Sequence, residues 1–300
     1  EIRLSLVGSE MCIRDRTMIK KLIGAVALML TCTAAFAAEG GFPLDKAPYR
    51  VNDMASLQNG AKLFVNYCLN CHSASSMRYN KLKDIGLTDQ QIKESLLFTG
   101  EKVGDMMTVA MTPKDAKKWF GTTPPDLSVI ARAKSVNAGP SGSDYIYTYL
   151  RTFYRDTSRA TGWNNLVFPS VGMPHALWER QGPRELTTVA MHEVEGKEGT
   201  PNTWERVTTV YDAQGFSTVK AEPVDKYHGH ATFDAKFKAA NPAQVATYDN
   251  DVADLTAFMS WMAEPVQTFR VKLGVGVMLF LLLFFLVMWR LNASYWKHVR

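Results

Sequence analysis

Apolar residues recur at helical spacing in several segments of the chain. In the range 57–71, the residues Leu57, Ala61, Phe64, Val65 and Cys68 form one apolar stripe, which predicts a helix. The sequence also predicts helices at 87–98, 113–120, 143–154 and 242–262.

Asp and Ser residues are expected to begin two helices in the middle of the chain. Pro124 and Pro125 interrupt regular structure, so Asp126 is expected to cap a short helix through Leu127 and Ala131. Ser143 or Asp144 is expected to begin the helix 143–154.

A different period appears in the second half of the chain. The ranges 187–194 and 203–211 alternate between apolar and polar residues, and the turn-rich sequence EGKEGTPN separates them. Gln214-Gly215 turns the chain into a third strand at 216–219. These strands predict a small antiparallel insertion, 186–222, to which no chemistry is assigned.

The C-terminal end carries an apolar run that is long enough to cross a bilayer. The run from Leu273 to Trp289 lies between Lys272 and Arg290, and it approaches the length needed for about 30 Å of hydrocarbon. The sequence therefore predicts a transmembrane helix at 266–290 and, from its positive residues, a cytoplasmic tail at 291–300.

The N-terminal end is typical of an exported protein. Met18-Ile19-Lys20-Lys21 precedes the apolar run 22–30, and Ala35-Phe36-Ala37 matches a signal-peptidase site. We expect a signal peptide at 18–37 rather than a retained membrane anchor. Residues 1–17 precede a complete signal and are interpreted as a spurious extension. The domain 38–265 is then expected to be periplasmic, with the helix 266–290 as its membrane anchor.

Composition and charge narrow the class of protein. The chain is 46% hydrophobic and 21% charged, which is typical of a globular protein. Its net charge is +5, yet residues 38–265 contain 24 Lys and Arg against 26 Asp and Glu. Because the positive excess lies at the two ends, a nucleic-acid-binding surface is not expected.

The strongest chemical signal is Cys68-Leu69-Asn70-Cys71-His72. Cys12 and Cys32 lie in the segments expected to be removed, so two cysteines remain. Zinc requires four ligands, and no other histidine has a finger-like spacing. A redox dithiol does not explain the adjacent histidine. Covalent attachment of one haem c explains both thiols and the imidazole, with His72 as an iron ligand.

The second iron ligand is predicted to be Met173. Pro174 restricts Met173 to extended backbone, and Gly172 lets the chain approach a ring face. His175 is a competing ligand two residues away, which leaves bis-histidine ligation open. His228 and His230 could bind a metal, although histidines in such a polar loop are more often exposed. The other candidate methionines are Met54, Met77, Met106, Met107, Met111, Met191, Met259 and Met262. Of these, Met106, Met107 and Met111 lie in a more polar segment, and Met259 and Met262 lie on the last helix of the domain.

Several motifs together resemble the cytochrome c1 family, the haem subunits of the bacterial cytochrome bc1 complex (ubiquinol–cytochrome c reductase). They are CLNCHSASSMRYNKL, PPDLSVIARAK, DYIYTYLRTFYRD, GWNNLVFPSVGMPHALW and DVADLTAFMSWMAEP, followed by one membrane helix. The resemblance implies a mainly α, cytochrome-c-like helical haem domain with a small antiparallel β insertion and one C-terminal transmembrane helix.

The resemblance also implies roles for individual residues. Cys68 and Cys71 would hold the haem, with His72 and Met173 as its axial ligands. Pro124, Pro125 and Tyr145 would lie against the haem. The family usually has Arg where this chain has Lys134, and that Arg contacts a haem propionate. Lys lacks the planar fork of Arg, so Lys134 is the weaker candidate for this contact.

The function implied by the resemblance is an electron relay without substrate chemistry of its own. The chain would pass single electrons from the Rieske iron–sulfur protein to a soluble cytochrome c, beside cytochrome b in a dimeric complex. The alternative is a membrane-anchored monohaem cytochrome c of another respiratory chain, such as a terminal-oxidase subunit. A haem enzyme or ligand sensor with an exchangeable sixth site is a third hypothesis.

Overall fold

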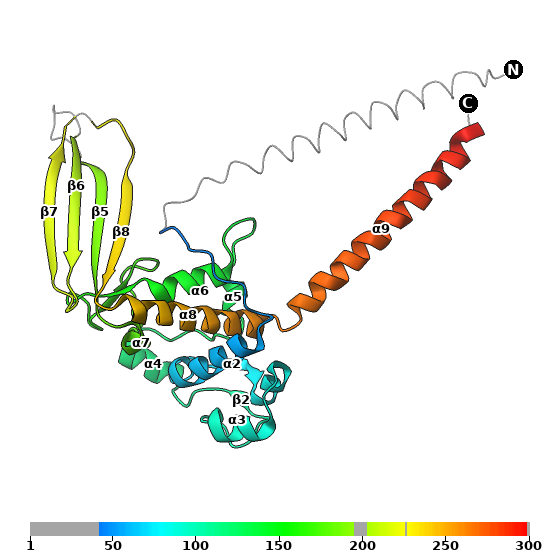
Figure 1. The fold of residues 1–300 in the computed structure, drawn as a ribbon, viewed down its shortest axis with the longest axis horizontal. Helices are drawn as coiled ribbons and strands as arrows, with labels where there is room; N and C mark the ends of the chain where they lie inside the picture. The colour runs from blue at the N-terminus through cyan, green and yellow to red at the C-terminus, as the bar shows by residue number, and fades with distance from the viewer. Residues whose placement is uncertain (1–41, 195–202, 226, 299–300) are drawn as a thin grey trace. The chain divides into compact units, whose positions relative to one another are not determined.

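Helix α8 (Pro242–Ala263) packs against α2 (Met54–Leu63) and α6 (Gly142–Arg151) in the helical part of the protein (Figure 1). The structure is a computed structural model that describes residues 42–194, 203–225 and 227–298. Residues 42–266 form one compact unit, and the chain from Gln267 onward belongs to a second unit. The predicted extension 1–17 and signal peptide 18–37 lie outside the described residues, as does the predicted turn 195–202.

The crossing of α2 and α8 depends on a glycine. Asp53 caps α2 by accepting a hydrogen bond from the backbone N–H of Ala55 (3.0 Å). Leu57, Gly60 and Ala61 form the buried face of the helix. A Cβ atom at Gly60 would lie 2.2 Å from the carbonyl oxygen of Asp254, so the two backbones approach this closely only because residue 60 has no side chain.

Most predicted helices are present, with shifted ends. The prediction for α4 (Pro113–Phe120) is confirmed to the residue, with Thr112 as its cap. The predicted helix 57–71 begins earlier, at Met54, and ends in the π-helical turn η1 (Phe64–Cys68). The predicted helix 87–98 is shorter, α3 (Asp89–Ser95), and follows the 3₁₀ helix η2 (Tyr79–Ile85). Two further short helices are α5 (Ile130–Ala133) and α7 (Trp178–Gln181).

Two predicted helix starts are wrong. Asp126 does not cap α5, which begins after Val129 without a side-chain cap. The carboxylate of Asp126 instead accepts hydrogen bonds from the backbone N–H groups of Ser75 and Ser128 (both 2.8 Å). These bonds hold the segment before α5 against strand β1 (Ala74–Arg78). Helix α6 is capped by Ser141 rather than Ser143, because Ser141 and Asp144 form a capping box.

Two short antiparallel pairs were not predicted. Strand β1 (Ala74–Arg78) pairs with β2 (Met106–Met107), and β3 (Phe153–Arg155) pairs with β4 (Trp163–Asn165). The predicted helix 143–154 therefore ends at Arg151, and Tyr154 lies in a strand.

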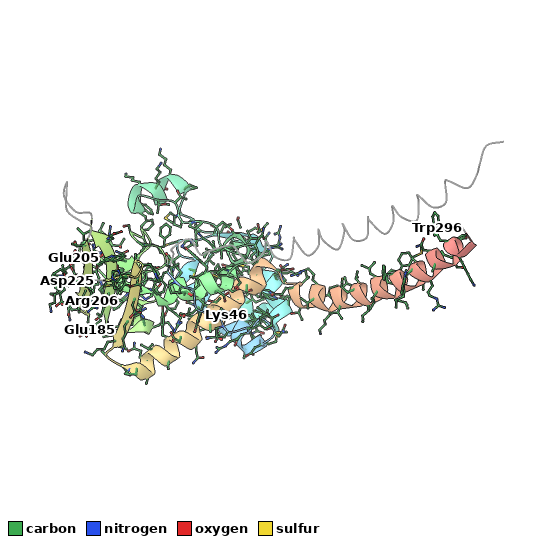
Figure 2. The ribbon with its side chains drawn as sticks, turned by 90° about the horizontal axis from the view of Figure 1, so that it is seen from above. Lys46, Glu185, Glu205, Arg206, Asp225 and Trp296 are labelled. Carbon is green, nitrogen blue, oxygen red and sulfur yellow. The ribbon has the colours of Figure 1, made fainter. Side chains whose placement is uncertain are left out.

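The β insertion is larger than the predicted range 186–222. It contains β5 (Arg184–Val194), β6 (Thr203–Tyr211), β7 (Ser217–Val224) and β8 (Thr232–Ala239) in the order β7-β6-β5-β8 (Figure 1). The missed strand β8 pairs with β5 in antiparallel register. Figure 2 shows the charged Glu185, Glu205 and Arg206 on this sheet.

Arg184 joins the sheet to the helical core. Its guanidinium donates hydrogen bonds to the backbone carbonyls of Arg151 (2.7 Å) and Phe153. The centre of the Phe237 ring, from β8, lies 3.7 Å from the guanidinium carbon. The first residue of β5 thus contacts the end of α6 and strand β3.

In the second unit, helix α9 (Gln267–Tyr295) is followed by the 3₁₀ turn η3 (Trp296–His298). Within the described part of the chain, α9 is the one helix long and apolar enough to cross a membrane. It contains the predicted apolar run and extends beyond it at both ends. The helix is consistent with a membrane-anchored protein.

Candidate functional site

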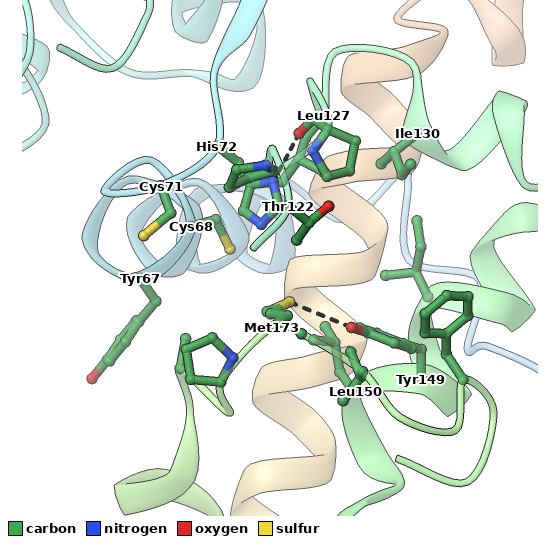
Figure 3. Close-up of a pocket in the computed structure, with 18 of the residues that line it drawn as sticks. Tyr67, Cys68, Cys71, His72, Thr122, Leu127, Ile130, Tyr149, Leu150 and Met173 are labelled. Atoms are coloured by element: carbon green, nitrogen blue, oxygen red, sulfur yellow. Dashed lines mark hydrogen bonds between the residues drawn. The ribbon is translucent and has the colours of Figure 1, made fainter. Parts of the chain in front are cut away.

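A cavity of about 340 Å³ lies among η1, α5, α6, α8 and the loop that carries Met173 (Figure 3). Its lining is mostly apolar, and the volume is in the range of small-molecule and cofactor sites. The structure places all eight residues of the predicted site around this one cavity: Cys68, Cys71, His72, Pro124, Pro125, Lys134, Tyr145 and Met173.

The imidazole of His72 is oriented by a backbone carbonyl. Its Nδ1 lies 2.8 Å from the carbonyl oxygen of Pro125, and because a carbonyl only accepts, Nδ1 carries the proton. Nε2 is then the unprotonated nitrogen, which is the form that binds a metal. Burial lowers the pKa of His72, which also favours the neutral ring. The Pro125 carbonyl thus sets the orientation of the His72 ring and leaves Nε2 free to bind a metal.

The two cysteines lie on one turn of chain at the end of η1. The N–H groups of Cys71 and His72 both donate to the carbonyl of Cys68 (3.1 and 2.9 Å), which brings the three side chains to one side of the cavity. Burial raises the pKa of Cys68 to about 12 and also raises that of Cys71. A redox dithiol requires a lowered thiol pKa, so this environment argues against dithiol chemistry.

Two asparagines hold the loop that carries Met173. Asn165 Oδ1 accepts hydrogen bonds from the N–H groups of Val167 (2.9 Å) and Phe168 (3.1 Å). Asn164 Oδ1 accepts from the N–H of Ser170 (2.9 Å), which has a left-handed backbone (φ 60°). Both asparagines are buried, so the loop is tied to β4 from inside the protein.

Three aromatic and cationic groups line the wall formed by α5 and α6. The Tyr149 hydroxyl lies 3.5 Å from Met173 Sδ, and its ring stacks on Tyr145 with centroids 5.9 Å apart. Burial raises the pKa of Tyr149, so the phenol keeps its proton and is a hydrogen-bond donor. The ammonium of Lys134 lies 4.7 Å from the centre of the Tyr145 ring, which is a cation–π distance. Lys134 therefore places a positive charge at the cavity wall.

The competing ligand His175 is not among the residues that line the cavity. Its ring stacks on Phe153 (centroids 4.7 Å apart) and meets the edges of Trp163 (5.0 Å) and Tyr248 (6.1 Å). The imidazole is buried in an aromatic core, which favours Met173 over His175 as the residue that can reach a cofactor.

Among the candidate methionines, Met173 and Met259 both line the cavity. The other candidates do not line it: Met54, Met77, Met106, Met107, Met111, Met191 and Met262. Met259 lies on α8, where its side chain is 4% exposed and belongs to the hydrophobic core. Met173 lies on the loop and has a hydrogen-bond donor at its sulfur. Met173 is therefore better placed than Met259 to bind a cofactor in the cavity.

The loop histidines His228 and His230 are exposed. In residues 42–194, 203–225 and 227–298, no group of three or more His, Cys, Asp and Glu side chains lies close enough to hold a metal ion.

Sequence reasoning missed the contact of Tyr149 and the roles of Asn164 and Asn165. Tyr145 and Tyr149 are four residues apart on α6, and this spacing alone places them on one helix face. A second phenol beside Tyr145 could therefore have been predicted. The contact of its hydroxyl with Met173 depends on the path of the loop and could not.

The residues present fit a haem of the c type. Two neighbouring thiols, an imidazole with a free Nε2 and a thioether sulfur line one largely apolar cavity, and these are the donors such a group requires. Fold and site together therefore define a candidate c-type cytochrome.

The comparisons with known proteins agree with this class. The chain matches the Cytochrome C1 family over residues 45–223 and 234–299. It is 39% identical to cytochrome c1 of Allochromatium vinosum, covering 93% of this chain and 99% of that protein. It is also 39% identical to a protein of Nitrosomonas europaea named ammonia monooxygenase gamma subunit, covering 94% and 99%. Cytochrome c1 of Rhodospirillum rubrum is 27% identical, over 95% and 99%.

The chain belongs to the cytochrome c1 family. This membership confirms the resemblance seen in the sequence and the mainly α fold with its antiparallel strands. The protein is thus a haem electron-transfer subunit of a bc1-type complex.

Proposed function

We propose that this chain carries one covalently bound haem c and passes single electrons from a Rieske iron–sulfur protein to a soluble c-type cytochrome. When bound, the haem supplies an iron that alternates between the ferric and ferrous states. Cys68 and Cys71 would form the covalent links, and His72 and Met173 would be the axial ligands. Such a closed ligand set suits electron transfer rather than catalysis at the iron.

The observation that carries the proposal is that His72 and Met173 line the same cavity from separate segments of the chain (Figure 3). His72 follows η1, whereas Met173 lies about a hundred residues later in a loop held by Asn164 and Asn165. Their orienting contacts come from the protein itself: the Pro125 carbonyl for His72, and the Tyr149 hydroxyl for Met173.

The rest of the chain supports the assignment to a membrane-bound relay. Helix α9 would anchor the haem domain on the periplasmic face of the bacterial inner membrane, beside cytochrome b in a dimeric complex. The slight acidic excess of residues 38–265 would suit a basic electron acceptor through weak steering.

The ligand assignment is tested by replacing each cavity methionine in turn. Met173→Leu should keep the haem covalently attached, lose the long-wavelength methionine–iron charge-transfer band of the oxidised protein and lower the midpoint potential. Met259→Leu should keep the band. Loss of the band in Met259→Leu alone would assign the ligand to α8 and overturn Met173.

The place in the respiratory chain is tested by purification from mildly solubilised membranes. Recovery of the chain with cytochrome b and a Rieske protein, and reduction of its haem by ubiquinol in that preparation, would support the proposal. Recovery with terminal-oxidase subunits instead would favour the alternative. A reduced spectrum that carbon monoxide changes would favour an exchangeable sixth site.

A further inference from the structure

The sulfur of Met173 has a hydrogen-bond donor from within the protein. The hydroxyl of Tyr149 lies 3.5 Å from Met173 Sδ, and Figure 3 shows this contact at the cavity wall. The donor comes from α6 and the sulfur from the loop that follows β4, so two separate elements meet at this atom.

The position of the Tyr149 ring is set by its neighbours. It stacks on Tyr145 with an interplanar angle of 11° and meets Phe153 edge-on, with centroids 5.1 Å apart. The side chain Nδ2 of Asn165 donates to the backbone carbonyl of Tyr149 (2.7 Å), while Oδ1 of the same asparagine accepts from the N–H of Phe168. The buried side chain of Asn165 therefore forms hydrogen bonds both to helix α6 and to the loop that carries Met173.

The contact is compatible with ligation of a metal by the same sulfur. A thioether sulfur has two lone pairs, so one can face a cofactor while the other accepts the phenol hydrogen. A donor at the second lone pair withdraws electron density from the sulfur and brings a partial positive charge near the iron. Both effects destabilise the ferric form more than the ferrous form, because the ferric form carries the larger charge.

We propose that Tyr149 is a positioning residue that orients the Met173 sulfur and raises the reduction potential of the haem. This inference rests on the proposed function, because it requires Met173 to be an axial ligand. It assigns to α6 a part in setting the driving force of electron transfer, in addition to forming the cavity wall.

The test is the variant Tyr149→Phe in the full chain, which removes the hydroxyl and keeps the ring. We expect the haem to stay covalently attached and the charge-transfer band of the oxidised protein to shift. Loss of one hydrogen bond is worth about 1 kcal/mol, so the ratio of oxidised to reduced protein at a fixed potential should rise by up to about fivefold. With 59 mV per tenfold change, this corresponds to a midpoint potential lower by up to about 40 mV.

Tyr147→Phe is the matched control. Tyr147 is also a buried phenol on α6, but it does not line the cavity, and its ring faces the guanidinium of Arg151 at 4.6 Å. Removal of the Tyr147 hydroxyl should leave the charge-transfer band and the midpoint potential unchanged. Tyr149→Leu, a second variant without the hydroxyl, should lower the potential as Tyr149→Phe does.

The outcomes separate this inference from the ligand assignment. If Met173→Leu abolishes the band but Tyr149→Phe and Tyr149→Leu keep the wild-type band and potential, the role of Tyr149 is refuted while the ligand assignment stands. If Met173→Leu leaves the band unchanged, the ligand assignment and the inference both fail.

Discussion

His175 follows Met173 by only two positions, yet its environment is entirely different. The imidazole is 2% exposed, and both of its ring nitrogens are buried with no hydrogen-bond partner within 3.5 Å among the described residues. Burial, with a smaller effect from the positive charge of Arg184, lowers its pKa to about 3. The native protein therefore holds His175 as a neutral ring in an aromatic core.

This burial predicts a loss of stability in acid. Below about pH 6.5 the unfolded chain protonates His175, whereas the native chain resists protonation until about pH 3. Stability should therefore fall as the pH decreases through this window, by up to about 5 kcal/mol from this residue. The expected result is a smaller acid-induced loss of unfolding free energy in His175→Leu, measured by denaturant titration at several pH values.

His228→Leu is the control for this experiment, because His228 is exposed in a loop. It should show the same pH dependence as the wild type. Equal pH dependence in all three proteins would contradict the assignment of the acid sensitivity to His175.

At the scale of elements, the helical pattern predicted where helices form better than where they end. Helix ends were set by residues outside the apolar stripe. Asp53 begins α2 before the first apolar position, and the capping box of Ser141 begins α6. Strand β8 was missed although Phe233, Ala235 and Phe237 alternate with polar residues, and it forms because β5 offers it a free edge.

The crossing of α2 and α8 predicts a strong effect of a small substitution. In Gly60→Ala the new methyl group would lie 2.2 Å from the Asp254 carbonyl and 2.6 Å from Phe258 Cβ, so the helices must separate. We expect a loss of about 1–3 kcal/mol or more in the free energy of unfolding, measured by chemical denaturation.

Gly104→Ala is the corresponding control, because a Cβ at Gly104 meets no atom within 4 Å from any described residue beyond its two chain neighbours. Its free energy of unfolding should stay within about 0.5 kcal/mol of the wild type. If both variants lost equal stability, the close approach at Gly60 would not be the cause.

At the scale of the whole molecule, the cavity and the apolar helix belong to separate compact units. Every residue that lines the cavity lies between Tyr67 and Met259, before α9 begins. The haem site should therefore form without the helix.

A chain that ends at Pro265 tests this separation. We expect it in the soluble fraction with the spectrum of the full-length protein, whereas the full-length protein should stay with the membrane after a high-salt wash. A truncated chain that remained in the membrane fraction would show that another segment holds the protein there. A soluble chain with an altered spectrum would show that α9 supports the site.

The sequence by itself determined the class of site, because two thiols and an imidazole within five residues are positioned by local backbone geometry alone. It also determined the apolar helix, because an apolar run of that length and composition is typical of a membrane-spanning helix. Tertiary structure decided that Met173 and Met259 line the cavity, that His175 does not, and that Tyr149 meets the Met173 sulfur. Those relations join segments far apart in the chain, and packing and loop hydrogen bonds set them rather than any local pattern.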